Sequence, residues 1–530
     1  MEPARLTQFG AVELARAIQA GDVSAREVVD AHIERIEEVD EALNAVVIRR
    51  FEAARAEADA ADSARRHGES LGPLHGVPVT IKDQFDVAGL PTVVGTPRLR
   101  GAVARSDGPV VGAWRRAGAI VLGKGNAPQL LGAVETDNDV FGRTNNPWDL
   151  ERTPGGSSGG DAAIVAARGV PLALAADLGG SLRLPAAWCG LTTLVPTARR
   201  FPTAALPGSR MAIDSAGVVA VPGPFARSTA DATAALRVMA RDMVARPRGM
   251  HPPVPWAEPA DVDVSRLRVA VIPEVAGWTP SPAVRRALDD AAEALRASGA
   301  DVETWDDAPD LERFIHLGIA LFTAAGNAPY RQALDGDPAH ALLKGDLFMG
   351  SLPNAARAPL ASLMRSLGQQ RAARLVPWTL RTSAARLYEL LGERIVLEEA
   401  FLEALDAGGF DAIVLPPAPH PAPRHRSTPE MVDANLGGSA FNVLGMPSGV
   451  VPVTTVRAGE ESDRAPSRDG AERAVRASEE GSAGLPVGVM VAARHWREDV
   501  VLAVMAAIEA ASPPLTLVLA AGKEARPIAG

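Results

Sequence analysis

Two serines in glycine-rich loops are the residues of this chain whose types and spacing best suit chemistry. Ser157 lies in the run Gly155 to Gly160, and Ser181 follows two glycines 24 residues further on. Glycines beside a hydroxyl let the backbone approach a ligand or take dihedral angles that a side chain forbids. Consecutive free N–H groups in such a loop suit a developing negative charge. We therefore interpret residues 153–200 as the centre of a nucleophilic site.

A serine hydroxyl attacks well only when a base takes its proton. Histidine is the usual base, yet none of the nine histidines falls between residues 75 and 251. The nearest other candidate is Lys82, which follows an apolar run in a chain with four lysines among its 54 basic residues. Burial lowers the pKa of a lysine until it can accept a proton, which arginine cannot do. The residues by themselves leave a second interpretation open, a buried Lys82 paired with Asp83 or Asp86.

The segments around these residues alternate between strand and helix. A short buried strand over 77–82 leads into Lys82, and residues 109–124 predict a helix followed by a strand. The Ala/Val/Leu-rich segment between the two serine loops can form a helix and then a buried strand, and 266–305 reads as strand, helix, strand. This alternation predicts an α/β fold.

Three other segments differ from this pattern. Residues 11–66 predict two or three helices, with Ser24 and Glu27 forming a capping box. Segment 341–381 has leucines on one helical face with arginines interleaved, which indicates a core-facing helix, or alternatively one that lies on a membrane surface or covers an apolar channel. The polar and charged residues 457–484 predict a mobile insertion between two buried strands.

Composition limits the classes of function. The net charge of −10 gives no reason to expect a nucleic-acid partner, whose binding rests on clustered positive charge. Cys189 is the single cysteine, so no intramolecular disulfide or cysteine-based zinc site can form. The N-terminus lacks the pattern of a signal peptide, and no apolar run reaches the roughly 18 residues of a spanning helix. We therefore expect a cytoplasmic protein without a spanning membrane segment.

Two motifs have the residue spacing of other enzyme classes but lack the residues around them that those classes need. Gly118, Gly123 and Lys124 are spaced as in a phosphate-binding loop, but Gly125 stands where a Ser or Thr should hold the metal, and the intervening residues predict a strand. The serines at 157 and 158 also match the nucleophile elbow of α/β-hydrolases, although no downstream histidine stands in a recognisable pattern. Neither motif has the context that its chemistry requires.

The segments GVPVTIKD, GGSSGG and GGSLRLPAAWCGL, together with the spacing of the two serines, resemble the amidase signature family over nearly the whole chain. This resemblance implies an α/β fold in which a large mixed β-sheet core is sandwiched between layers of α-helices. It implies one amidase domain over residues 1–530. Its regions are a helical N-terminal region (1–70), a signature core (71–240), an α/β and helical lid-like region (260–410) and C-terminal strands and helix (411–530) with the insertion.

The resemblance also implies a serine amidohydrolase with a Ser-cisSer-Lys triad that forms an acyl-enzyme. Ser181 corresponds to the nucleophile, Ser157 to the bridging serine joined to Gly156 by a cis peptide bond, and Lys82 to the base. The implied oxyanion hole consists of the backbone N–H groups of Leu178, Gly179, Gly180 and Ser181. Neither a metal nor an organic cofactor is implied.

Three further residues have a supporting role in this interpretation. Ser158 is an adjacent hydroxyl, and Asp177 and Arg183 flank the nucleophile loop as a pair that holds its shape. The chain departs from the family pattern nearby: Ala175-Ala176, Val195 and Met490 stand where Gly followed by Thr or Ser, Lys and Gln are usual. The first departure removes a hydroxyl from the surroundings of Ser157.

Within the family, the C-terminal third resembles the fatty-acid amide hydrolase subgroup. Leu130, Leu131 and Val134 match a segment that lines the acyl channel there, which implies a small-molecule substrate with an apolar acyl or aryl group, as an amide, carbamate or ester. The assembly that we consider for this chain is a homodimer. The alternative is the glutamine-hydrolysing A subunit of a tRNA-dependent amidotransferase, whose small polar site fits these apolar residues poorly.

Overall fold

One mixed β-sheet forms the centre of the protein. The computed structural model describes residues 3–69, 71–203, 214–215, 217–247, 249, 251–379 and 381–517. In this part of the chain eleven strands hydrogen-bond in the order β1-β3-β2-β4-β8-β5-β12-β13-β11-β9-β10. Their bounds are β1 (Val46–Arg49), β2 (Pro78–Lys82), β3 (Ile120–Gly125), β4 (Leu172–Asp177), β5 (Thr192–Val195), β8 (Val221–Ala226), β9 (Arg268–Val271), β10 (Asp301–Thr304), β11 (Ala412–Leu415), β12 (Ser448–Thr455) and β13 (Pro486–Ala493). The short pair β6 (Asp214–Ser215) and β7 (Val218–Val219) is separate.

Strand direction decides which loops meet. Strand β2 pairs in parallel with both β3 and β4, whereas β8, β5, β12 and β13 are joined by antiparallel pairing. Parallel neighbours end at the same edge of a sheet, so the loops that follow β2 and β4 lie side by side. This edge carries the site described below.

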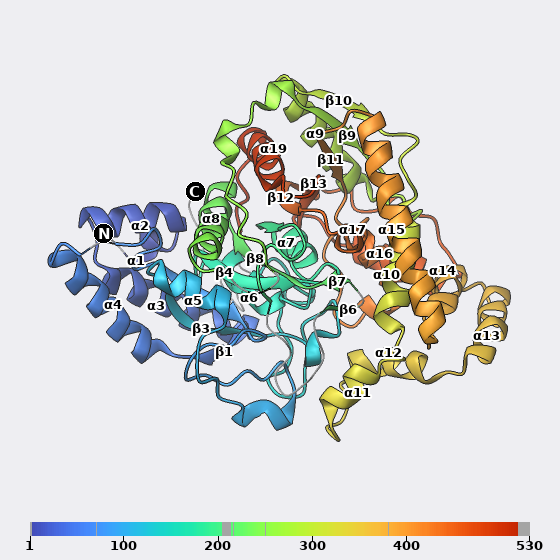
Figure 1. Cartoon of the computed structure of the whole chain (residues 1–530), viewed down its shortest axis with the longest axis horizontal. Coiled ribbons are helices and arrows are strands. Elements are labelled where there is room, and N and C mark those ends of the chain that lie inside the picture. The colour runs from blue at the N-terminus through green and yellow to red at the C-terminus, as the bar shows by residue number, and fades with distance from the viewer. Residues whose placement is uncertain are drawn as a thin grey trace.

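Helices cover both faces of the sheet, which confirms the predicted architecture (Figure 1). The central strands β2, β4 and β13 are buried along their whole length, as strands covered on both faces must be. Helices α6 (Gly159–Ala166) and α7 (Arg183–Cys189) pack on one side. Helices α8 (Thr229–Ala245), α9 (Pro282–Ala297) and α19 (Glu498–Ala511) pack on the other.

The N-terminal helices flank the β1 end of the sheet. They are α1 (Pro3–Leu6), α2 (Ala11–Ala20), α3 (Ala25–Leu43) and α4 (Phe51–Arg66), drawn in blue in Figure 1. The predicted capping box is present, because the Ser24 side chain accepts from Glu27 N–H and the Glu27 carboxylate accepts from Ser24 N–H. The helix and strand predicted over 109–124 are also found, as α5 (Pro109–Arg116) and β3.

A helical region between β10 and β11 extends to the right of the sheet in Figure 1. It consists of α10 (Leu311–Thr323), α11 (Ala328–Leu334), α12 (Ala341–Ser351), α13 (Asn354–Ser366), α14 (Gln370–Leu375) and α15 (Ala384–Ala407). The interpretation of the leucine stripe as core-facing is wrong at two positions, since Leu363 is 56% and Leu367 64% exposed. Ala361 and Arg357 are the buried residues of α13 instead. None of the helices in the described ranges combines the length and the hydropathy that a membrane crossing needs.

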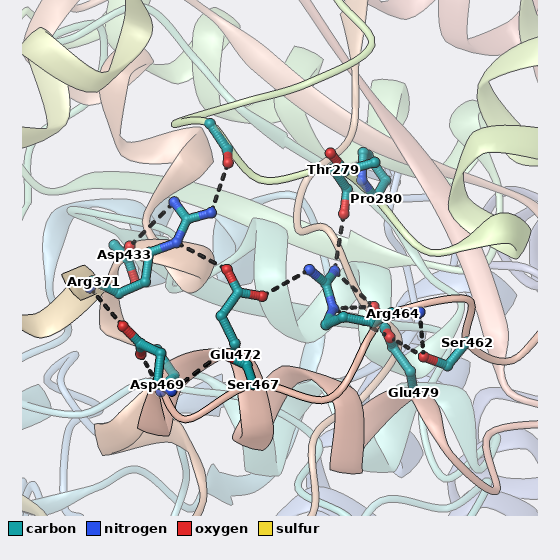
Figure 2. Close-up of polar contacts among 12 residues, drawn as sticks. Thr279, Pro280, Arg371, Asp433, Ser462, Arg464, Ser467, Asp469, Glu472 and Glu479 are labelled. Carbon is teal, nitrogen blue, oxygen red and sulfur yellow. Dashed lines mark hydrogen bonds and ion pairs between the residues drawn. The ribbon is translucent and has the colours of Figure 1, made fainter. Parts of the chain in front are cut away.

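The insertion at 457–484 lies between buried strands β12 and β13, as expected, and it contains a helix, α18 (Gly470–Glu479), whose Ala471, Ala474 and Val475 are buried. Figure 2 shows the alternating charges that hold it. Glu472 accepts from Arg371 Nε at 3.1 Å and from Arg464 Nη1 at 3.0 Å, and Arg464 also reaches Glu479 at 2.9 Å.

Trp278 lies against the same two arginines. The guanidinium carbon of Arg371 is 3.9 Å from the centroid of the indole ring, and that of Arg464 is 5.4 Å away. A cation over an indole face is stabilising, and more so where water is excluded. The insertion is thus fastened to α14 and to the loop after β9, segments that are far from it in sequence.

Replacing Arg371 should weaken this junction. We expect Arg371→Ala to lower the free energy of unfolding by about 2 kcal/mol, because it removes the contact with Trp278 and leaves Glu472 with one arginine. Chemical denaturation measures the change. Arg374→Ala is the matched control: its side chain is 53% exposed and 3.8 Å from Glu312, so we expect at most about 0.5 kcal/mol. Equal losses in the two variants would contradict the assignment.

Candidate active site

The ends of two parallel strands bring the predicted site residues together. Lys82 is the last residue of β2, and Ser181 lies in the loop between β4 and α7. Ser157 lies just before α6, the helix that packs on β2, β3 and β4. All three side chains therefore meet at one edge of the sheet although 99 residues separate Lys82 from Ser181.

A continuous chain of short contacts joins the three side chains. Lys82 Nζ is 2.8 Å from Ser157 Oγ, and Ser157 Oγ is 2.9 Å from Ser181 Oγ. Lys82 Nζ also donates to the Ala176 carbonyl at 3.3 Å. Lys82 and Ser157 are each 1% exposed, whereas Ser181 is partly exposed. The chain thus leads from a buried amine to a hydroxyl that a small molecule can reach.

The interpretation of Lys82 as one half of a buried ion pair is wrong. Asp83 pairs with Lys124 at 2.8 Å, and Asp86 accepts from the Thr92 hydroxyl. Within the described residues no carboxylate oxygen lies within 4.0 Å of Lys82 Nζ. Burial lowers the pKa of Lys82 to about 7, against the opposing influence of Asp161 and Asp177. The amine is therefore available in its neutral form near neutral pH.

The loop around Ser157 is held by groups from the segment 133–136. The Gly156–Ser157 peptide bond is cis. Thr136 Oγ1 donates to the Gly155 carbonyl at 2.9 Å and accepts from Gly159 N–H at 3.1 Å. A side chain on Gly156 would come within 2.6 Å of Glu135 N, so only glycine fits there. These contacts fix the position of the Ser157 hydroxyl.

Asp177 fixes the conformation of the nucleophile loop. Its buried carboxylate accepts from the backbone N–H groups of Gly180 at 2.8 Å and Leu182 at 2.9 Å, and it pairs with Arg183 at 2.8 Å. Burial by itself would raise the pKa of Asp177, but the charge of Arg183 and these donors hold the pKa at about 2. The expected pairing of Asp177 with Arg183 is therefore present in the structure.

The C-terminal region closes this network. Arg183 also donates to the Gly438 carbonyl and to Asn442 Oδ1, and Asn442 Nδ2 donates to Asp177 Oδ1 at 3.1 Å. These partners lie around η7 (Gly437–Ser439) and α17 (Ala440–Leu444), which follow α16 (Val432–Asn435). The nucleophile loop is consequently braced by a segment about 260 residues away in sequence.

The four backbone amides expected in the oxyanion hole are not equivalent. Gly180, whose φ is 121°, donates its N–H to Asp177. The N–H groups of Leu178, Gly179 and Ser181 have no acceptor among the residues that the structure describes. Three donors are thus open at the loop, and the fourth holds its shape. Ser158 is buried and donates to the Ala176 carbonyl at 3.4 Å.

An apolar cluster lies next to the nucleophile loop. It contains Leu130, Tyr330 and Leu343, and both Leu131 and Leu178 pack against it. Leu130 and Leu131 have φ angles of 52° and 62°, so two successive leucines take the left-handed conformation that L residues avoid. Val134 is partly buried and belongs to the segment that packs on Gly156. The three predicted pocket residues therefore lie along one segment from the apolar cluster to the Ser157 loop.

Three polar residues of the site were not predicted. Thr136 and Asn442 lack any sequence signal, because their role depends on contacts with distant loops. Asp161 had a signal: it is the one charged residue at the start of an otherwise apolar helix, directly after the glycine-rich loop. A charge in such a position needs a partner or a function.

Known hydrolases resemble this chain over most of its length. The Amidase family model matches residues 27–502. The chain is 33% identical to indoleacetamide hydrolase of Bradyrhizobium diazoefficiens over 95% of this chain and 86% of that protein. It is 30% identical to fatty-acid amide hydrolase 1 of Sus scrofa over 95% of this chain and 85% of that protein. A solved fatty acid amide hydrolase superposes with a TM-score of 0.84 at 25% identity, covering 96% of this chain and 86% of the other.

A further relative matches only part of the chain. It is the A subunit of the glutamyl-tRNA(Gln) amidotransferase of Acidothermus cellulolyticus, which is 41% identical over 294 residues, or 55% of this chain and 57% of that protein. The likeness to the two hydrolases therefore extends over far more of the chain.

Removal of the Asp177 charge should destabilise the fold. We expect Asp177→Asn to lower the free energy of unfolding by about 3–5 kcal/mol at pH 7, because the Arg183 charge stays buried without its partner. The folded pKa lies below the unfolded value, so this contribution is complete above about pH 4 and is lost as pH falls toward about 2. Urea denaturation at several pH values measures it.

The double variant Asp177→Asn with Arg183→Met is the control. Since it removes both charges, it should lose less than the sum of the two single variants. Additive losses, or a loss below about 1 kcal/mol for Asp177→Asn, would contradict this account.

Proposed function

The chain belongs to the amidase family and is a hydrolase of amide carbon–nitrogen bonds, and we propose that it cleaves apolar acyl or aryl amides through a Ser181–Ser157–Lys82 triad. The observation that carries the proposal is the pair of contacts, 2.8 and 2.9 Å, that joins the buried amine to the partly exposed hydroxyl. A neutral amine at the end of such a chain can accept the proton that a serine nucleophile must lose.

The proposed acylation step is as follows. Ser181 Oγ attacks the carbonyl carbon while its proton passes to Ser157 Oγ, and the Ser157 proton passes to neutral Lys82. The negative oxygen that forms is held by the open N–H groups of Leu178, Gly179 and Ser181. Each such donor contributes about 3–4 kcal/mol to the stability of the transition state. In this proposal Gly180 shapes the hole through Asp177 and does not contact the oxyanion.

The carbon–nitrogen bond then breaks. The proton on Lys82 returns through Ser157 to the departing nitrogen, so the amine leaves neutral and an ester with Ser181 remains. A water molecule attacks this ester, gives up its proton by the same route, and releases the acid while Ser181 regains its hydrogen. In this proposal the protein side chains that carry protons in both steps are Ser181, Ser157 and Lys82.

The apolar cluster supports the proposed substrate class. Leu178 contacts this cluster and also lies in the nucleophile loop, so an apolar group beside the scissile carbonyl would reach Leu130 and Leu131. Two of the relatives that match over most of the chain are named for an indoleacetamide and for fatty-acid amides. We propose Leu130, Leu131 and Val134 as pocket residues on this basis. Carbamates and esters of similar shape would fit the same pocket.

The glutamine-hydrolysing component of an amidotransferase is the second candidate, because of the partial match noted above. Free glutamine needs polar partners for its α-ammonium and α-carboxylate groups, whereas Leu178 of the nucleophile loop packs against a cluster that contains Leu130 and has Leu131 beside it. The purified chain alone should therefore hydrolyse an aryl anilide or a long-chain amide. Activity on glutamine only, or only with added subunits, would favour the second candidate.

The nucleophile can be tested independently of substrate. We expect a fluorophosphonate probe to label the wild type and not Ser181→Ala, and the same substitution to lower kcat by at least about 10⁴-fold. Mass spectrometry of the labelled peptide identifies the residue. Ser158→Ala removes the neighbouring hydroxyl and should still be labelled, although more slowly. Labelling of Ser181→Ala would rule out the proposed nucleophile.

The role of Lys82 predicts the direction of the pH dependence. Because only neutral Lys82 accepts a proton, kcat/KM should fall below about pH 7, by about tenfold for each further pH unit. Lys82→Arg keeps a positive charge but cannot lose a proton, and it should abolish activity across the whole range. A profile that stays flat down to pH 5, or an active Lys82→Arg, would contradict the proposal.

A further inference from the structure

Asp161 is a buried carboxylate close to the triad that the mechanism above does not use. It lies in the first turn of α6, shortly after Ser157 in the chain, and is 0% exposed. Thr80 Oγ1 donates to Asp161 Oδ1 at 2.9 Å. Thr80 and Lys82 are two residues apart on β2, so their side chains point to the same face of the sheet. Asp161 therefore lies on the face to which Lys82 points.

Gly125 defines the position of the Asp161 carboxylate more closely. It is the register partner of Lys82 on the neighbouring strand β3. A Cβ atom on Gly125 would lie only 2.3 Å from Asp161 Oδ2, so the carboxylate occupies the space that any other side chain at this position would fill. The glycine that breaks the phosphate-loop pattern in the sequence is thus the residue that admits Asp161 beside Lys82.

The second carboxylate oxygen has no hydrogen-bond partner. Asp161 Oδ2 is buried and unpaired among the described residues, although a buried carboxylate oxygen normally accepts at least one hydrogen bond. Lys82 Nζ is more than 4.0 Å from both oxygens, so the two groups interact through space and not as a contact pair. Such an interaction is effective where water is excluded.

The other charges near the two groups can be named. On β4, Asp177 also favours the charged form of Lys82, to a smaller degree than Asp161, and it is neutralised by Arg183. Directly after β2, Asp83 repels Asp161 and is neutralised by Lys124 of β3. Burial raises the pKa of Asp161 to about 7, while the Thr80 hydroxyl and Lys82 oppose the rise. Of these three carboxylates, Asp161 is the one that has no cation in contact with it among the residues that the structure describes.

We propose that Asp161 is a positioning residue for catalysis, whose carboxylate stabilises the ammonium that forms on Lys82 when Ser181 gives up its proton. This inference rests on the proposed function of the triad. The proton on Lys82 comes from Ser157, and none is transferred to Asp161. The separation of the two groups is essential, because a contact pair would keep Lys82 protonated and prevent it from acting as a base. At longer range the carboxylate lowers the energy of the ammonium without trapping it.

Asp161→Asn tests this role, because asparagine keeps the shape and an oxygen that can accept from Thr80 but removes the charge. Without the carboxylate the ammonium is less favoured, so the midpoint of the acidic limb of kcat/KM should move to lower pH by about one unit. The plateau value of kcat above pH 8 should fall about tenfold, since the developing ammonium loses its stabilisation. The rate of fluorophosphonate labelling against pH should show the same shift without substrate.

Thr80 provides the matched pair of variants. Thr80→Val removes the hydroxyl that favours the ionised carboxylate, so it should shift the midpoint in the same direction by a smaller amount. Thr80→Ser keeps the hydroxyl and should behave as the wild type. These variants also serve as the test if Asp161→Asn does not fold, which circular dichroism and thermal melting would reveal.

The outcomes separate the two proposals. A lower kcat with an unchanged midpoint in Asp161→Asn and in Thr80→Val would show a structural role only and overturn this inference. The triad proposal would stand in that case, provided that Ser181→Ala is inactive. An active Ser181→Ala, or a wild type without an acidic limb, would overturn the proposed function first, whatever the behaviour of Asp161.

Discussion

The site depends on the buried amine of Lys82, which contacts the Ser157 hydroxyl and the Ala176 carbonyl. In the described part of the chain no carboxylate contacts it. Lys124 shows the alternative on the adjacent strand, where an equally buried lysine is paired with Asp83. Register explains the difference. Lys124 is opposite Ile81 and Gly125 is opposite Lys82, so Lys124 and Asp83 share one face of the sheet, and Lys82, Thr80 and Asp161 share the other. A shift of one residue between β2 and β3 would turn Lys124 away from the face that it shares with Asp83.

Buried charge is used in two other ways around the nucleophile. Asp177 is surrounded by donors and by Arg183, which keep it ionised and turn it into a rigid support for the loop. The guanidinium of Arg183 in turn connects this loop to the segment near Gly438 and Asn442. Among the described residues, the N–H groups of Leu178, Gly179 and Ser181 do not donate to the Asp177 carboxylate and stay available to a ligand. Support and open donors therefore arise from one arrangement of the same few residues.

The helical region and the insertion lie outside this centre and are joined by a third set of charges. Arg371, Glu472, Arg464 and Glu479 alternate in sign around Trp278, and they connect α14 with α18. Because α11 and α12 contribute to the apolar cluster beside Leu178, the same region that this junction fastens also borders the proposed pocket. Leu363 of α13 and Leu367 directly after this helix are exposed and lie outside both the junction and the apolar cluster.

The amino-acid sequence alone determined the α/β class, the strand that ends in Lys82 and the two serine loops, because strand and helix periodicity and glycine-rich loops are local patterns. The family followed from the resemblance of its signature motifs. The sequence also identified Asp177 and Arg183, which are close together along the chain. Only the tertiary structure decided that Lys82 contacts Ser157 while Lys124 takes Asp83, that Gly180 gives its N–H to Asp177, and that Asp161 occupies the space over Gly125. Each of these depends on the register of neighbouring strands or on loops that meet across the sheet edge, and no local pattern encodes either.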